Sequence, residues 1–312
     1  MRIIRGVEAT LPEDRGATAA LGNFDGVHLG HRHVIDVARA AQPEAPLAVV
    51  TFDPHPRRFF NPDAPPFQLT DAETKARRLE KMGVERLFLL GFDAALAALT
   101  PAAFCEDVLA RGFGLAHVAV GADFCFGKGR AGTAETLREQ GARLGFGVSV
   151  VDLLAGETEP MSSSAIRAAL ADGRPEDAAR MLGHWHRIEG PVLHGDKRGR
   201  TLGYPTANMA LAGLMPPRFG VYAVRVDVLD GPHAGVYDGV ASLGVRPMFG
   251  VNEPNLETCL FDFAGDLYGA RLSVALVSFI RPELAFETVE ALVGRMAQDS
   301  AEARRRLAAL PA

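Results

Sequence analysis

The chain has 312 residues, of which 48% are hydrophobic and 23% charged, and its formal net charge is −5. This size and composition predict a globular protein with two domains, each large enough to bury a core. The mild acidity excludes the basic field that duplex nucleic acid favours, and three scattered cysteines, Cys105, Cys125 and Cys259, indicate neither a zinc site nor a disulfide framework.

The first half of the chain alternates strand-like and helix-like segments, and its first residues lack the apolar stretch of a signal peptide. Thr70 or Asp71 is a start signal for the second helix, and Thr100-Pro101 is one for the third. The alternation predicts a doubly wound parallel sheet, covered by helices on both faces, that binds ligands at the carboxyl ends of its strands. The expected strands are 17–24, 47–52, 86–90, 117–120 and 148–151, and the expected helices are 31–41, 71–82, 101–110 and 133–144.

A glycine-rich segment, Gly22-Asn23-Phe24-Asp25-Gly26-Val27-His28-Leu29-Gly30-His31, follows the first of these strands and opens a helix. Glycines allow close approach of the backbone to a ligand, and the helix start offers N–H groups and a positive dipole end that suit phosphate. His28 and His31 can both donate to one phosphate chain and stabilise charge on an α-phosphate. The alternative, that they only cap the helix or face solvent, is weaker for a pair than for a lone histidine.

Three later segments of the first half suit the same chemistry. The segment Thr51 to Pro56 ends in Pro-His-Pro, which acts either as a rigid turn or as a substrate contact. The GxGxxG pattern at 127–132 does not follow its strand directly and lies beyond the first strand, so it indicates a basic loop near ATP rather than a dinucleotide fingerprint. The serines at 162–164 precede a helix, and Arg167 adds a forked phosphate donor.

The second half, from about His184, has strand-like runs that follow one another directly. The run at 221–228 alternates between an apolar and a partly polar face, which indicates antiparallel strands and a small barrel or sandwich. The apolar run at 272–280 is too short to cross a bilayer and predicts a buried strand. The other expected strands are 187–193, 237–243 and 256–263. From Pro282 the tail predicts a helix with a core-facing stripe of Phe286, Val289, Val293 and Met296.

The segment Gly195 to Asn208 joins a glycine-rich basic loop to the tetrapeptide Pro205-Thr206-Ala207-Asn208. Such a loop can enclose phosphates with its N–H groups and charge. Thr206 and Asn208 share a face if the segment is extended, and their oxygens suit Mg²⁺, or another divalent cation, beside phosphate oxygens. A solvated hairpin is the weaker alternative.

Glu257 alternates onto the same strand face as Cys259, Phe261 and Phe263. A carboxylate on an apolar face is unfavourable unless it has a partner or a task, so Glu257 is a candidate general base. The alternative is an edge residue that reaches solvent at the start of the strand.

These segments together resemble the bacterial bifunctional riboflavin kinase/FAD synthetases. HxGH is typical of nucleotidylyltransferases, and GNFDGVHLGH, TFDPHP, GADFCFG and SSSAIR agree with the adenylyltransferase domain of the family in the same order, although Ser164 replaces the usual Thr. GRTLGYPTAN is similar to the riboflavin kinase signature, and NLETCLFDF resembles the strand that carries the catalytic glutamate. The resemblance covers almost the whole chain.

The resemblance implies a nucleotidylyltransferase-like FMN adenylyltransferase domain at 1–183 and a riboflavin kinase domain, a Greek-key β-barrel with a terminal helix, at 184–312. The kinase would convert riboflavin and ATP to FMN and ADP, and the transferase would convert FMN and ATP to FAD and pyrophosphate.

The implied catalytic residues are Glu257 in the kinase and His28 and His31 in the transferase. Those implied to bind nucleotide in the transferase are Gly22, Asn23, Phe24, Asp25, Gly26, Gly30, Asp123, Phe126, Arg130, Ser163, Ser164 and Arg167. Those implied to bind nucleotide or flavin in the kinase are Gly195, Lys197, Gly199, Arg200, Gly203, Pro205 and Tyr268. Thr206 and Asn208 are implied to hold the metal.

Two positions depart from the family pattern. Met248 replaces a Thr and removes a hydroxyl near the kinase site, and Gly183-His184-Trp185-His186 replaces Gly-Arg-Pro-Tyr, which concerns domain packing. One rival interpretation keeps the kinase but gives the first domain no activity or another acceptor. A second is a non-catalytic flavin-binding protein, which would not need a carboxylate beside Pro-Thr-Ala-Asn. We expect a cytoplasmic protein without nucleic-acid or membrane partners, and the sequence does not indicate its oligomeric state.

Overall fold

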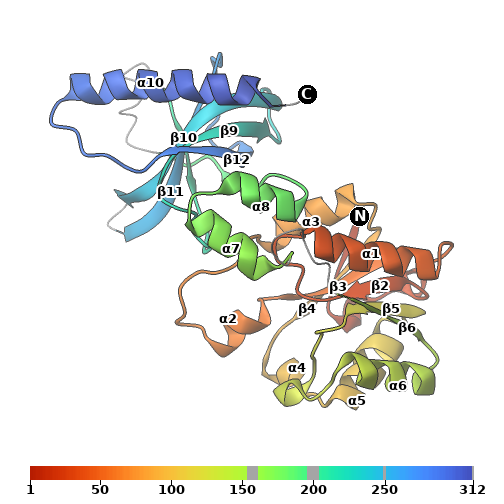
Figure 1. The fold of residues 1–312 in the computed structure, drawn as a ribbon. Coiled ribbons are helices and arrows are strands. Elements are labelled where there is room, and N and C mark those ends of the chain that lie inside the picture. Colours follow the sequence, from red (N-terminus) through yellow and green to blue (C-terminus); the bar gives the residue numbers. More distant parts are fainter. Residues whose placement is uncertain (153–160, 195–203, 249–250, 311–312) are drawn as a thin grey trace. The chain divides into compact units, whose positions relative to one another are not determined.

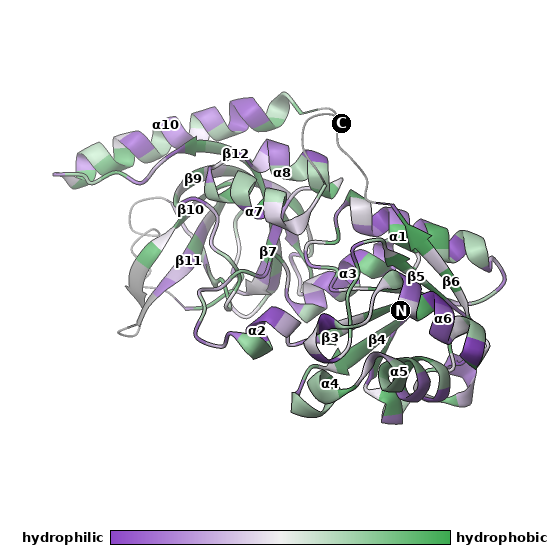
Figure 2. Cartoon of the chain, turned by 60° about the horizontal axis from the view of Figure 1, so that its bottom comes forward, coloured by the Kyte–Doolittle hydropathy of each residue, from purple (hydrophilic) through white to green (hydrophobic). Residues whose placement is uncertain are grey.

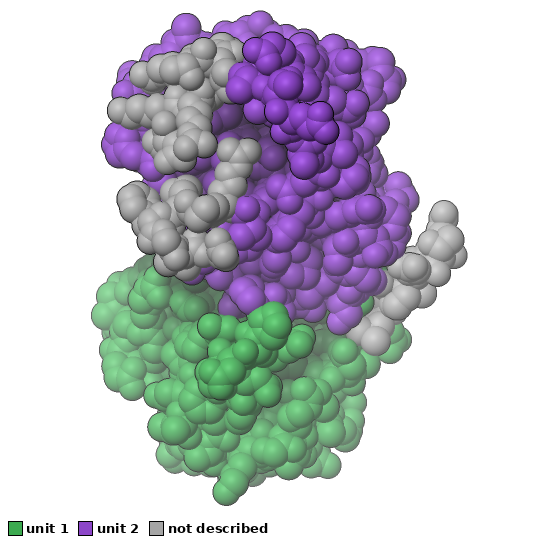
Figure 3. All heavy atoms as spheres, turned by 90° about the vertical axis from the view of Figure 1, so that its left-hand side faces the viewer, with its two compact units in different colours: residues 1–65, 71–162 green, residues 66–70, 163–312 purple. Residues whose placement is uncertain are grey.

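A computed structural model describes residues 1–152, 161–194, 204–248 and 251–310 of the chain. They form two compact units, residues 1–65 with 71–162 and residues 66–70 with 163–312, which Figure 3 shows in different colours. The short segment 66–70 belongs to the second unit, where the Met215 N–H donates to the Gln68 carbonyl over 2.9 Å. The compact units therefore divide at 162/163, and the expected activity boundary at 183/184 stays a prediction.

The first unit contains a parallel sheet of six strands in the order β1-β4-β3-β2-β5-β6 (Figure 1). All five expected strands are present. The sixth, β1, was missed because arginines flank its two isoleucines and only Ile4 is buried. The strands are β1 (Arg2–Arg5), β2 (Thr18–Leu21), β3 (Leu47–Asp53), β4 (Arg86–Gly91), β5 (His117–Gly121) and β6 (Gly147–Val151).

Helices cover both faces of this sheet, as expected. The side chains of Asp71, Thr100 and Thr133 cap α3, α5 and α6. The expected helix at 101–110 is instead a short α-helix that continues as a π-helix, η3. The helices are α1 (Leu29–Ala41), α2 (Pro56–Phe60), α3 (Ala72–Lys81), α4 (Ala94–Ala98), α5 (Pro101–Ala103), η3 (Phe104–Gly112) and α6 (Ala134–Leu144), with short 3-10 turns at η1 (Val7–Ala9), η2 (Pro12–Asp14) and η4 (Lys128–Arg130).

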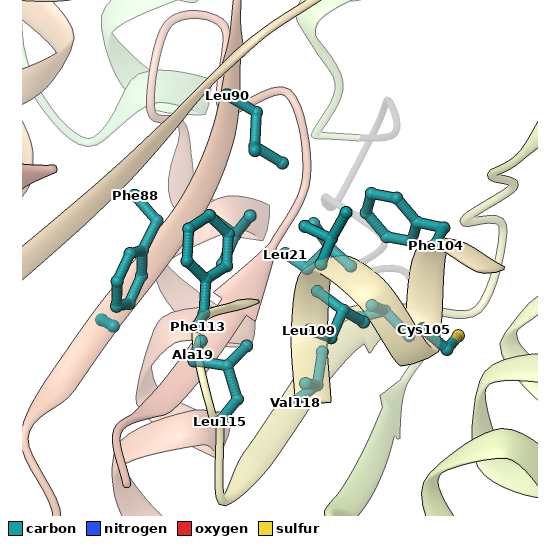
Figure 4. Close-up of a cluster of buried hydrophobic side chains, with 14 of the residues drawn as sticks. Ala19, Leu21, Phe88, Leu90, Phe104, Cys105, Leu109, Phe113, Leu115 and Val118 are labelled. Carbon is teal, nitrogen blue, oxygen red and sulfur yellow. The ribbon is translucent and has the colours of Figure 1, made fainter. Parts of the chain in front are cut away.

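Two apolar clusters hold the sheet between its helices. One joins the sheet to α1 and α3. The other joins it to η3 and α6, and in Figure 4 the rings of Phe88 and Phe113 lie against each other, with centroids 4.3 Å apart. Burial of these large side chains makes the sheet a rigid platform for the loops at its edge.

The second unit is an antiparallel six-stranded barrel in the order β7-β12-β9-β10-β11-β8. The Leu193 N–H donates to the Asn208 carbonyl over 2.8 Å, which links the end of β7 to β8. The strands are β7 (Arg187–Pro191), β8 (Ala207–Ala210), β9 (Gly220–Val228), β10 (Gly235–Met248), β11 (Val251–Leu260) and β12 (Arg271–Arg281). The expected alternation of β9 is confirmed, with Tyr222, Val224, Val226 and Val228 in the barrel core.

In the described part of the second unit, three helices accompany the barrel: α7 (Ser163–Ala171), α8 (Pro175–Leu182) and α10 (Val289–Ala308). The prediction that the last helix starts near Pro282 was wrong. The Thr288 hydroxyl accepts from the Ala291 N–H over 3.2 Å and fixes the helix start there.

The prediction of which residues pack α10 against the core was also wrong. Phe286 precedes the helix, and Val289 is 56% exposed. The residues that α10 buries are instead Asp299, Ala303 and Leu307, in its second half. Figure 2 shows the polar and apolar residues that alternate along this helix.

Among the residues that the structure describes, no helix is long and apolar enough to cross a membrane. The run at 272–280 is instead part of β12, as expected from its length.

Two candidate active sites

The glycine-rich loop of the first unit leaves the carboxyl end of β2. This strand lies between β3 and β5, so successive strands are added to one side of β2 up to β4 and to its other side from β5 onward. Ligands are expected at the carboxyl ends of the strands at such a switch point. The segment after β5, which carries Asp123 and Arg130, starts at the same edge because β5 is parallel to β2. The topology therefore brings two of the predicted nucleotide-binding segments to one edge.

His28 and His31 form a reciprocal cap at the start of α1. The His31 N–H donates to Nδ1 of His28, and the His28 N–H donates to Nδ1 of His31, each over 3.3 Å. The two rings are stacked, with centroids 3.6 Å apart. Capping, which the sequence offered as the alternative to a phosphate contact, is thus present, and it uses only one nitrogen of each ring.

This cap fixes the chemistry of the remaining nitrogens. An Nδ1 that accepts a hydrogen bond carries no proton, so each neutral ring bears its proton on Nε2. Burial, followed by the nearby His28 and Lys75, lowers the pKa of His31 well below its ordinary value. His31 is therefore arranged as a neutral imidazole with an Nε2–H donor suited to phosphate oxygens, and the cap directs Nδ1 of His28 to the His31 N–H.

Gly30 is required between the two histidines. A Cβ at this position would lie 3.1 Å from Nδ1 and Cε1 of His28 and 3.3 Å from the carbonyl oxygen of Met161. These contacts are tighter than ordinary packing, so a side chain here would require the His28 ring or the Met161 carbonyl to shift by a few tenths of an ångström. The glycine of the motif is thus explained by the geometry of the ring next to it.

Several predicted nucleotide contacts have buried side chains. Phe24, Asp25 and Phe126 are 1%, 2% and 7% exposed, and the Phe24 ring lies 4.9 Å from that of His31. Their side chains belong to the platform, and contact with a ligand would involve their backbone. Asp123 and Arg130 are exposed, and Arg130 has a positive φ of 58°.

The serine-rich segment starts α7 in the second compact unit. The helix start expected near these serines is present, but Ser163 and Ser164 are the first two residues of α7 rather than residues that precede it. Nε of Arg167 donates to the Phe67 carbonyl over 2.6 Å, and its guanidinium lies 5.5 Å from the Phe67 ring. Arg167 therefore ties segment 66–70 to α7. These residues belong to the second unit and His28 belongs to the first, so a common site for them stays a prediction.

The Pro-His-Pro turn also uses its histidine as a cap. Nδ1 of His55 accepts from the Arg57 N–H over 3.1 Å at the start of α2. The turn alternative therefore has a geometric basis, and a direct role with substrate stays a prediction.

Lys75 is a residue of this site that we did not predict. It is only 3% exposed, and its Nζ donates to the Asn23 carbonyl over 2.8 Å. Its position on α3 could have indicated this, because Lys75 precedes Leu79 by four residues and Met82 by seven, which places it on the apolar face.

The candidate kinase site lies on β8 and β11. Asn208 is directly opposite Glu257 in the register of these strands, so the two side chains share one face. Leu256, Thr258 and Leu260 are buried on the opposite face, whereas Glu257 is half-buried. Glu257 alternates with Cys259 as expected, but β11 ends at Leu260, so Phe261 and Phe263 do not continue that strand face. The apolar face of β11 is the opposite one.

Polar side chains surround this pair. Nδ2 of Asn255 donates to Oε1 of Glu257 over 3.4 Å, and Nδ2 of Asn208 donates to the Thr206 carbonyl over 3.4 Å. The second bond leaves Oδ1 as the amide atom that could accept a cation. Asn208 is 9% exposed and Asn255 is 5% exposed, so this polar group is largely screened from water.

A pocket of about 380 Å³ adjoins these residues. Pro205, Thr206, Asn208 and Tyr268 line it, together with the segment Phe263 to Leu267. The Tyr268 ring lies 4.0 Å from that of His194. The structure thus gathers four of the predicted kinase residues around one hollow, which can hold part of a nucleotide or flavin.

The other predicted kinase residues, Gly195, Lys197, Gly199, Arg200 and Gly203, lie outside the described residues, as does the Met248 side chain. Among the described residues, no cluster of three or more His, Cys, Asp or Glu side chains could hold a metal by itself. Trp185, from the segment that departs from the family pattern, packs against the cluster that joins α10 to the barrel.

Comparisons with known proteins agree with this two-site arrangement. Residues 10–165 match the family model of FAD synthetase, and residues 182–307 match that of riboflavin kinase.

Relatives that match nearly the whole chain are named for both activities. The bifunctional riboflavin kinase/FMN adenylyltransferase of Pseudomonas fluorescens is 41% identical over 97% of each chain, and that of Bacillus subtilis is 38% identical over 94% of this chain and 93% of the relative.

A crystal structure described as a macrolide-efflux protein from Streptococcus pneumoniae has a TM-score of 0.84 and 31% identity, over 97% of this chain and 99% of that chain. The chain accordingly belongs to the family of bifunctional riboflavin kinase/FMN adenylyltransferases, ATP-utilising enzymes that make FMN from riboflavin and FAD from FMN.

Proposed function

We propose that Glu257 is the general base of the kinase. Its carboxylate takes the proton of the riboflavin 5′-hydroxyl, whose oxygen attacks the γ-phosphorus of ATP, and ADP leaves. The observation that carries this proposal is the register that puts Glu257 opposite Asn208, because the proton acceptor then lies beside the residues suited to the nucleotide.

We further propose that Thr206 and Asn208 hold a divalent cation, with Mg²⁺ as the first choice. The fit is supported by the hard oxygen donors of Thr206 and Asn208, which line one pocket with room for phosphate oxygens. When bound, the cation would offset the negative charge of the phosphates. The described side chains would contribute orientation, with the Asn208 amide held through Nδ2 and the Glu257 carboxylate held through Asn255.

In the adenylyltransferase we propose that His28 and His31 donate from Nε2 to the phosphates of ATP. The phosphate of FMN, already anionic, attacks the α-phosphorus without a general base, and pyrophosphate leaves. The histidines then act by position and charge stabilisation, together with backbone N–H groups of the glycine-rich loop and with Ser163, Ser164 and Arg167.

The finer expectations on partners and compartment belong to this proposal. The products ADP and pyrophosphate follow from the two reactions above. The cytoplasm is supported by three cysteines that form no disulfide, and the lack of a nucleic-acid partner is supported by the net charge of −5.

A pair of matched variants tests the kinase assignment. Glu257→Gln should lower FMN formation by about 100-fold or more while FAD formation from supplied FMN stays unchanged. Glu253→Gln, on the same strand but exposed, is the control and should leave both activities intact. Equal loss in both glutamate variants, or full kinase activity in Glu257→Gln, would refute the assignment.

A further inference from the structure

The first unit contains a buried lysine, Lys75, whose ammonium group donates hydrogen bonds within the protein rather than to solvent. Nζ of Lys75 donates to the Asn23 carbonyl over 2.8 Å and to Oγ1 of Thr51 over 3.3 Å, and the Thr51 hydroxyl donates to the same carbonyl over 3.0 Å. Lys75 is 3% exposed and Thr51 is fully buried. One backbone carbonyl of the glycine-rich loop is therefore held by two buried donors from two different elements.

That carbonyl begins the most strained part of the loop. Phe24, Gly26 and Val27 all have positive φ, at 49°, 82° and 47°. Two of the three are not glycine, and such residues keep this conformation only where the surroundings impose it. Because a trans peptide directs its carbonyl and N–H to opposite sides, the two bonds to Asn23 also turn the Phe24 N–H away from the buried lysine.

The loop leads directly to the histidine pair. His28, one residue after Val27, caps α1 and accepts from the His31 N–H. The path of the chain through the loop thus determines where the His28 ring lies. Lys75 fixes this path through its hydrogen bond to the Asn23 carbonyl.

Lys75 also acts on the histidines through its charge. Burial lowers the pKa of Lys75 to about 8, opposed by the carboxylates of Asp25, Asp53 and Asp71, so the side chain is mainly cationic at neutral pH. This charge, after burial and His28, is the third cause that lowers the pKa of His31. It thereby favours the neutral ring whose proton is on Nε2.

We propose that Lys75 is a positioning residue for FMN adenylylation: it anchors the Asn23 carbonyl and so fixes the loop that presents His28 and His31. This inference rests on the proposed role of the two histidines. An apolar side chain would fill the same buried place without the desolvation of an ammonium group, so stability alone does not account for a lysine here.

Four variants of the full chain test this role, with the kinase activity of each protein as the internal control for folding. Lys75→Met should lower kcat for FMN adenylylation by about 100-fold, the loss that follows displacement of a catalytic group by about 1 Å. Lys75→Arg should restore part of it. Thr51→Val should cost less than Lys75→Met because it keeps the charged donor, whose bond to the Asn23 carbonyl is the shorter of the two. Lys81→Met, at the exposed end of the same helix, should match the wild type.

The pH profile separates positioning from mere support of the fold. Removal of the Lys75 charge should raise the pKa of His31, so the acid limb of the adenylylation profile should move to higher pH in Lys75→Met but not in Thr51→Val. The inference is overturned if Lys75→Met behaves like Lys81→Met, if it loses both activities together, or if its acid limb stays in place. A His28→Asn variant with full adenylylation would instead overturn the histidine site itself, and this inference with it.

Discussion

Asn208 and Glu257 face each other directly across strands β8 and β11, in a register set by four consecutive residue pairs. In an antiparallel pair, opposite side chains are the closest that two strands offer. The proposed cation ligand and the proposed general base are therefore placed by backbone hydrogen bonds rather than by a loop, which gives the kinase site a rigid frame.

Removal of the Asn208 amide should weaken cation binding at the kinase site. In Asn208→Ala the backbone bonds to β7 and β11 remain, but the amide oxygen is gone. We expect the Mg²⁺ concentration for half-maximal FMN formation to rise by about 10-fold or more, as for other groups that support a metal. A Mg²⁺ titration of both reactions measures this, and FAD formation is the internal control. An unchanged Mg²⁺ dependence of the kinase would remove Asn208 from the cation site.

Gly30→Ala should impair adenylylation because its Cβ would push against the His28 ring. We expect a loss of about 10-fold to 100-fold, the range for a small displacement of a catalytic group. Gly294→Ala is the matched control: it lies in α10, and a Cβ there meets nothing within 4 Å. This control should stabilise the chain by up to about 1 kcal/mol. Wild-type adenylylation in Gly30→Ala would show that the ring position is not critical.

His186 should make the second unit sensitive to acid. Burial, and then His184, lowers its pKa to about 4, whereas the unfolded chain has the ordinary value of 6.5. Above pH 6.5 both states are neutral and the stability is complete. As the pH falls toward 4, only the unfolded chain takes up the proton, so stability falls, by about 3 kcal/mol in total.

The fluorescence of Trp185 reports this loss, because it is the single tryptophan and packs in the barrel unit. Denaturant unfolding at pH 7 and pH 5 should show less pH dependence in His186→Asn than in the wild type. The exposed His194→Asn is the control and should keep the wild-type dependence. Equal pH dependence in all three proteins would mean that His186 protonates freely in the folded state.

The attachment of α10 should depend on one buried ion pair. Arg281 donates to both carboxylate oxygens of Asp299, through Nε over 3.0 Å and through Nη2 over 2.6 Å, and both side chains are largely buried. Asp299→Ala leaves a buried guanidinium unpaired and should lower the free energy of unfolding by about 3 kcal/mol or more. Asp262→Asn weakens the exposed pair with Arg304 and should change it by less than about 1 kcal/mol.

The parts of the fold that the sequence predicted are those with strong periodicity and side-chain caps. Strands β2 to β5 and the alternation of β9 were predicted correctly because each buries an apolar run or face. The start of α10 was not, because the apolar spacing of Phe286 and Val289 continued past a cap, Thr288, that the pattern did not weigh. Strand β1 was missed because charged residues flank its short apolar centre.

The candidate sites were predicted as motifs but not as geometry. Spacing identified His28 and His31, yet their reciprocal cap, which assigns the proton to Nε2, depends on ring orientation that no spacing contains. The pairing of Asn208 with Glu257 depends on a register between segments nearly fifty residues apart. Lys75 was missed because a lysine in an amphipathic helix is usually solvated, although its spacing from Leu79 and Met82 places it on the apolar face that the structure buries.

The central claim is that one chain carries two separate phosphorus-transfer sites, and complementation between variants tests it most directly. In each protein, riboflavin, Mg²⁺ and ATP are supplied and the FAD formed is measured by chromatography. On its own, Glu257→Gln lacks kinase activity. On its own, His28→Asn lacks adenylyltransferase activity, and its asparagine can still act as the N-cap acceptor of α1. We predict that neither variant makes FAD and that their mixture does, because FMN made by one is consumed by the other. A mixture that makes no FAD, although each variant retains its other activity on supplied substrate, would contradict independent sites, and so would the loss of both activities in either variant.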